Sequence, residues 1–163
     1  GGSKNAELIR KIILNNKSSL NIKTDLLLML AARSENIEKI IKKNYKKKII
    51  LIDRFTDSTI AYQHFGMGLN LKLINLVNNY IIENFKPNLT FLSIVNKKNM
   101  TKRLKLRNKK NKYDNFKYKF YNKVQKGFLK LSKNKKNYII LDSNNKNSNE
   151  INNILINKIK KII

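Results

Sequence analysis

Three short apolar runs, separated by longer segments with helical periodicity, constrain the fold of this chain most strongly. The runs lie at 48–52, 89–95 and 137–142, and short apolar runs of this kind are typical of strands buried on both faces of a sheet. Segments with helical spacing alternate with them at 6–14, 25–45, 70–85, 116–131 and 149–163. A further helix is expected to begin near Asp57 or Ser58. The alternation predicts one α/β domain over 1–163, with a parallel sheet covered by helices on both faces.

The composition narrows the class of protein. The formal net charge is +26, which is typical of a nucleic-acid binder but also of biased composition. The lysines are spread along the whole chain, and uncharged Asn is abundant too, so bias is favoured and no specific nucleic-acid partner is expected.

The cysteine content and the hydropathy of the chain indicate its cellular compartment. There is no cysteine, which excludes disulfides and thiolate metal sites and predicts a cytoplasmic protein. The longest apolar stretch, 26–32, is far too short to cross a membrane, so no membrane partner is expected.

The segment "LIDRFTDSTIAYQ" (51–63) places an acid and a base at the end of the first predicted strand. Ligands of open parallel sheets bind beyond the carboxyl ends of the strands. Arg54 suits an anion such as phosphate, because a guanidinium donates two parallel hydrogen bonds. Asp53 offers the oxygen ligand that Mg²⁺ prefers.

The helix predicted after Arg54 carries a polar wall with one aromatic ring. Ser58 and Tyr62 are four residues apart and share a face, as do Thr59 and Gln63. Such a wall suits a sugar or a base. From the residues alone, a surface salt bridge with a packed tyrosine is an equally good interpretation.

The segment "DRFTDSTIAYQ" closely resembles the signature of bacterial thymidylate kinases, and the flanking segments resemble the same family in order and spacing. These segments are "GGSKNAELIRKIIL", "TDLLLMLAAR", "FGMGLN", "FKPNLTFLSI" and "FYNKVQKGFLKL". The resemblance covers residues 1 to 163. It implies a kinase that moves the γ-phosphoryl group of ATP onto dTMP with Mg²⁺, and a homodimer formed through the apolar faces of 24–43 and 71–85.

The resemblance also implies roles for individual residues. Arg54 holds the dTMP phosphate and is catalytic, Asp53 helps to place the metal, and Arg33 hydrogen-bonds the thymine edge. Tyr62 lies against the deoxyribose. The remaining side chains of the dTMP site are then Ser58, Thr59, Gln63 and Met29.

The same resemblance implies that the basic stretch 97–115 is the lid over ATP. Arg103 and Arg107 are the candidates for stabilising the transferring phosphoryl group, and Lys112 completes the ATP contacts.

The chain departs from the family pattern at several positions. Met29 replaces the usual phenylalanine that stacks on thymine, which weakens the expectation of strict thymine selectivity. His64 replaces a glycine, and Met67 stands where an arginine often lies between two glycines. Lys112 replaces an arginine and gives up bidentate phosphate contact.

The string Gly-x-x-x-x-Gly-Lys-Ser/Thr, which cradles ATP phosphates, does not occur in the 163 residues. We therefore expect a P-loop NTPase-type three-layer α/β/α fold in fragment form, without its first strand, P-loop and second strand. Such a fragment is expected to fold poorly and to turn over no ATP by itself. Three alternatives stay open: another nucleotide or deoxynucleoside kinase, a basic nucleic-acid-binding module, and a non-catalytic remnant.

Overall fold

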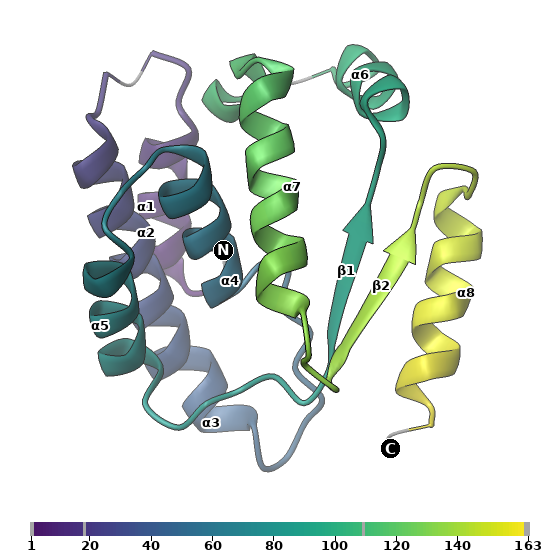
Figure 1. Ribbon diagram of the computed structural model, residues 1–163. Coiled ribbons are helices and arrows are strands. Elements are labelled where there is room, and N and C mark those ends of the chain that lie inside the picture. Colours follow the sequence, from purple (N-terminus) through teal and green to yellow (C-terminus); the bar gives the residue numbers. More distant parts are fainter. Residues whose placement is uncertain (1, 18, 109, 162–163) are drawn as a thin grey trace. The chain divides into compact units, whose positions relative to one another are not determined.

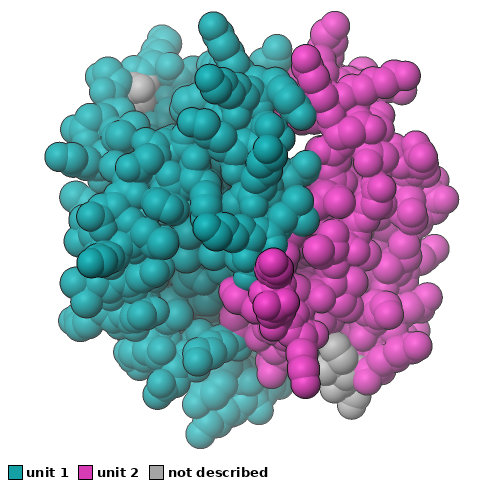
Figure 2. Space-filling view, in the orientation of Figure 1, with its two compact units in different colours: residues 1–86, 109–131 teal, residues 87–108, 132–163 magenta. Residues whose placement is uncertain are grey.

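The computed structural model describes residues 2–17, 19–108 and 110–161. Its contacts divide the chain into two compact units, which Figure 2 colours separately. The first unit consists of 1–86 and 109–131, and the second of 87–108 and 132–163. None of the described helices is long and apolar enough to cross a membrane.

The first unit is helical (Figure 1). Its α-helices are α1 (Lys4–Leu14), α2 (Ile22–Asn36), α3 (Lys42–Asn44), α4 (Thr56–Thr59), α5 (Leu71–Ile82) and α7 (Tyr118–Ser132). Two π-helical segments, η1 (Ile37–Ile41) and η2 (Ile60–Gly66), continue α2 and α4, and η3 (Lys112–Asn115) is a 3₁₀ helix. All the predicted helices of this unit are therefore present, and the helix after Arg54 begins at Thr56, close to its predicted start.

Side-chain caps explain where several helices begin. The side chain of Asn21 accepts hydrogen bonds from the Lys23 and Thr24 amides at the start of α2. Asn70 caps α5 in the same way by accepting from the Leu73 amide. These side chains satisfy amide groups that have no partner inside the helix.

The core of the first unit joins α2 to α5. Leu26, Leu30 and Ile74 are at most 4% exposed and form its centre. Ile60, Leu69, Val77 and Ile81 pack against them. One face of α5, at 74, 77, 78 and 81, therefore points inward with the spacing of a helix buried on one side.

Residues 48–52 do not form the predicted strand. They have no regular secondary structure and belong to no described sheet, and Ile49, Leu51 and Ile52 are 63%, 78% and 46% exposed. An apolar run becomes a buried strand only when its backbone groups find partners in a neighbouring strand, because unpaired buried amides are costly. No described strand supplies them here.

Helix α7 carries large apolar side chains at four-residue spacing, at 120, 124 and 128. Val124 is 4% exposed, and Phe128 and Phe120 both contact the ring of Tyr62. Phe116 precedes the helix and stacks on Phe120 with ring centroids 4.1 Å apart, yet stays 38% exposed.

The second unit contains the sheet. Strands β1 (Thr90–Ile94) and β2 (Tyr138–Asp142) pair in parallel, with Leu92 opposite Ile140. Helices α6 (Lys97–Lys105) and α8 (Ser148–Ile159) each follow one strand (Figure 1). Two of the three predicted strands and their parallel direction are therefore confirmed. A parallel pair needs a long crossover connection, and residues 95–137 provide one.

Candidate functional site

Arg54 has a left-handed backbone at the start of the signature segment. Its φ is 67°, which non-glycine residues seldom adopt and which costs roughly 1–3 kcal/mol. Strain of this kind is concentrated at functional sites. The side chain is exposed, and its guanidinium carbon lies 4.8 Å from the centroid of the Tyr62 ring. The structure therefore brings together the two residues predicted for phosphate and sugar.

The side chain of Arg33 donates three hydrogen bonds within the first unit. From α2, its Nη2 donates to the Thr59 hydroxyl at 2.6 Å and to the Phe55 carbonyl at 3.1 Å. Its Nη1 donates to Oδ1 of Asn78, on α5, at 2.7 Å. Burial lowers the pKa of Arg33 from 12.5 to about 10, against the opposing charge of Asp57. Arg33 therefore remains a cation at neutral pH, fixed by acceptors from separate segments.

Thr59 and Gln63 lie in the interior of the first unit. They are 1% and 0% exposed, and the π-helical turn η2 begins between them. Thr59 contacts Arg33, whereas neither polar atom of the Gln63 amide has a hydrogen-bond partner among the described residues. Each buried polar group without a partner lowers the free energy of unfolding by about 1–3 kcal/mol. Separately, π-helical turns are frequent at functional sites. Their direct contact with a substrate stays a prediction.

Three further residues predicted for the site lie on α2, on α4 and next to Arg54 in the chain. Ser58 lies in α4 and Met29 in α2, and both are half-buried. Asp53 is exposed, next to Arg54 in the chain. Among the described residues no cluster of three or more metal-binding side chains occurs, so Asp53 belongs to no such cluster.

Lys112 has a carboxylate partner inside the first unit. Its ammonium lies 2.6 and 2.5 Å from the two oxygens of Asp25, and the side chains are 17% and 5% exposed. The Tyr113 hydroxyl lies 3.4 Å from the same carboxylate, and the Tyr113 ring meets the Tyr62 ring edge-on at 6.0 Å. The pair thus links η3 to the start of α2, and Tyr113 of the same η3 helix packs against Tyr62.

Tyr113 has a strongly raised pKa. Burial is the largest cause, and the charge of Asp25 adds to it, because both disfavour the phenolate. The Gln63 amide opposes the shift, at a geometry outside that of a regular hydrogen bond.

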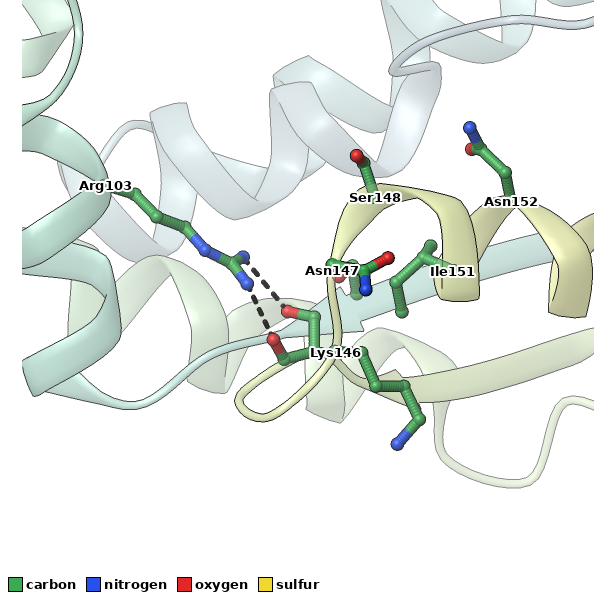
Figure 3. A pocket seen from close by; sticks show the side chains of 8 residues that line it. Arg103, Lys146, Asn147, Ser148, Ile151 and Asn152 are labelled. Carbon is green, nitrogen blue, oxygen red and sulfur yellow. Dashed lines mark hydrogen bonds between the residues drawn. The ribbon is translucent and has the colours of Figure 1, made fainter.

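A pocket of about 400 Å³ lies in the second unit, beyond the carboxyl ends of β1 and β2 (Figure 3). Arg103, on α6, donates to the Ser143 carbonyl at 2.6 Å and to its hydroxyl at 3.2 Å. The other lining residues include Ser93, Lys146, Asn147 and Ser148. Arg107 is exposed and does not line this pocket. The expected lid, 97–115, consists of α6, a connecting segment and η3, and it contributes to both units.

Comparison with known proteins decides the family. The family model described as "Thymidylate kinase" matches residues 1–154. A thymidylate kinase from Wolbachia sp. subsp. Brugia malayi is 36% identical over 162 residues, which are 98% of this chain and 76% of that protein. One from Mycoplasma capricolum is 35% identical and covers 99% of this chain and 79% of its own length. The chain belongs to the thymidylate kinase family.

A solved structure supports the same family. The crystal structure of a thymidylate kinase from Ehrlichia chaffeensis matches with a TM-score of 0.72 and 29% identity, over 99% of this chain and 77% of that one. The predicted α/β class of P-loop NTPase type is thereby confirmed, as is the prediction that the chain is an enzyme. Among the alternatives, membership of the thymidylate kinase family favours neither a nucleic-acid-binding module nor another kinase.

Two buried side chains that hold predicted site residues in place were not predicted from the sequence. Asn78 and Asp25 are buried polar side chains, at 2% and 3% exposure, and each binds a predicted site residue. The signal for Asn78 was available, because it interrupts the apolar face of α5. Nothing in the sequence pairs Asp25 with Lys112, which is 87 residues away.

Proposed function

We propose that the first unit carries the dTMP site of a thymidylate kinase, the enzyme family whose reaction is the phosphorylation of dTMP to dTDP with ATP. The observation that carries the proposal is the fixed guanidinium of Arg33 in the same unit as Arg54 and Tyr62. Arg33 donates to the thymine edge, and Tyr62 lies against the deoxyribose. Positioning and charge neutralisation are the main needs of phosphoryl transfer, and these side chains supply both.

Arg54 holds the phosphate of dTMP. Its exposed guanidinium lies over the Tyr62 ring, which leaves the planar fork available to phosphate oxygens. Substitution Arg54→Lys keeps the charge but loses the fork and the planar contact, so we expect dTMP to bind about tenfold more weakly. Titration calorimetry measures this directly. Equal affinity in the variant would contradict the role of Arg54.

Asp53 fits a Mg²⁺ held mainly by the substrates. Mg²⁺ commonly binds proteins through one or two carboxylates and takes its other ligands from water and phosphates. An exposed carboxylate next to Arg54 in the chain, outside any described cluster of three metal-binding side chains, suits that arrangement, whereas it does not suit a metal held entirely by the protein. The ion neutralises phosphate charge when it is bound.

The ATP side is assigned to the lid residues. Arg103 lines the pocket at the carboxyl ends of the strands, which is the usual place for a ligand of a parallel sheet. The resemblance also assigns Arg107 and Lys112 to ATP, and within the first unit Lys112 is paired with Asp25. Because the 163 residues contain no P-loop string, binding of dTMP is the direct test of what they do.

A homodimer through α5 and α2 is part of the proposal. Leu73, Leu76 and Tyr80 form an outward stripe on α5 and are 52%, 69% and 84% exposed, and Leu27 on α2 is 62% exposed. Large exposed apolar side chains gathered on one helix face are typical of protein–protein interfaces. We expect sedimentation to show a dimer that Leu76→Glu converts to a folded monomer. A monomeric unmodified protein, or a dimeric variant, would contradict this interface.

A further inference from the structure

Asn78 occupies a position where the helical pattern calls for an apolar side chain. It lies on the inward face of α5 with Ile74, Val77 and Ile81, and it is 2% exposed. Asn is a poor choice for such a position, because burying an amide is unfavourable unless both of its ends are hydrogen-bonded.

Only one end of this amide is satisfied. Oδ1 of Asn78 accepts from Arg33 at 2.7 Å, and a guanidinium donates only, so the oxygen has to face Arg33. Nδ2 then points into the interior, where it has no hydrogen-bond partner among the described residues. The gain from the charge-assisted bond is offset by the unsatisfied donor, so fold stability alone gives no reason for the amide.

The geometry at Arg33 supplies the reason. The bonds to Thr59 and Phe55 both leave from the same nitrogen, Nη2. Two bonds at one nitrogen leave the guanidinium plane free to pivot about that point. Asn78 is the described residue that holds the other terminal nitrogen, Nη1, and thereby fixes the direction of the remaining N–H groups.

We propose that Asn78 is a positioning residue that sets the base selectivity of the site through Arg33. The inference rests on the proposed function, in which Arg33 donates to the thymine edge. Thymine presents an accepting O4 where cytosine presents a donating amino group, so a fixed donor favours dTMP over dCMP. A guanidinium that pivots loses part of that discrimination.

Two variants test the proposal. Asn78→Leu keeps the number and branching of the side-chain heavy atoms without a polar group, and Asn78→Ser is too short to reach Arg33 and adds no bulk. We expect each to weaken dTMP binding about tenfold and to reduce the ratio of dTMP to dCMP affinity by a similar factor. Asn78→Asp retains the acceptor and should restore the ratio. Asn79→Leu, at an exposed neighbouring position, is the matched control and should leave the ratio unchanged.

The measurement is titration calorimetry with dTMP and dCMP, accompanied by thermal melts of each variant. A double variant adds a further check: in an Arg33→Met background, Asn78→Leu should have no additional effect on the ratio. If the unmodified protein shows no preference for dTMP, the proposed function fails. If it shows the preference and both folded Asn78 variants keep it in full, the positioning role of Asn78 is overturned.

Discussion

The buried pair of Lys112 and Asp25 gives the sharpest stability prediction. Substitution Lys112→Met keeps the length of the side chain but leaves the Asp25 carboxylate, 5% exposed, with the Tyr113 hydroxyl at 3.4 Å as a distant donor. Breaking a buried ion pair by removing one partner costs about 3–5 kcal/mol. Lys112 is 17% exposed, so we expect the lower end, about 3 kcal/mol. For a chain of this size that corresponds to a melting temperature lower by about 6–12 °C.

The opposite substitution should cost less. Asp25→Asn leaves an ammonium that can turn toward water, because Lys112 keeps the larger exposed fraction. Replacing both partners, as Asp25→Leu with Lys112→Met, should recover most of the loss, since a buried apolar pair needs no compensation. The order of stability is therefore the double apolar variant, then Asp25→Asn, then Lys112→Met.

Urea denaturation followed by circular dichroism measures these differences. Lys110→Met is the matched control, because Lys110 is an exposed lysine near the same turn. It should change the free energy of unfolding by less than about 0.5 kcal/mol. If Lys112→Met is no less stable than Lys110→Met, the pair contributes nothing and η3 is held by other contacts.

Two further predictions concern single side chains. Burial and Asp25 raise the pKa of Tyr113 above its ordinary value of 10.0, so the stability that its neutral form contributes is complete below pH 10 and is lost as the pH rises through the raised value. Tyr113→Phe should therefore remove part of the alkaline loss of stability seen in pH-dependent melts, and an unchanged alkaline limb would contradict this assignment. Arg103→Ala should weaken ATP binding and leave dTMP affinity unchanged, as measured by separate titrations of each nucleotide, whereas a variant that loses dTMP affinity instead would place Arg103 on the other substrate.

The predictable part of the fold is the part decided by local pattern. Helices with one apolar face, such as α5 and α7, could be predicted from the sequence, because burial of that face stabilises the helix. Strands β1 and β2 were predicted from their apolar runs, yet the similar run 48–52 forms no described strand. The difference lies in pairing, which depends on a neighbouring strand and not on the run itself.

The candidate site was predictable to the same extent. The signature segment identified Arg54 and Tyr62, and the structure brings these two together. Their supports were not predictable, because Asp25 meets Lys112, and Asn78 meets Arg33, only after the chain has folded. The π-helical turn at 60–66 could not be predicted from the spacing of apolar residues either, since that spacing is compatible with an ordinary α-helix.

The most direct test of the account is the affinity of this protein for dTMP compared with dCMP, measured by titration calorimetry at one pH and salt concentration. We expect dTMP to bind more tightly by at least about tenfold, because in the proposed site the fixed guanidinium of Arg33 donates to an oxygen that cytosine lacks. Equal affinities, or no binding of either nucleotide by the folded protein, would contradict a thymine site built around Arg33.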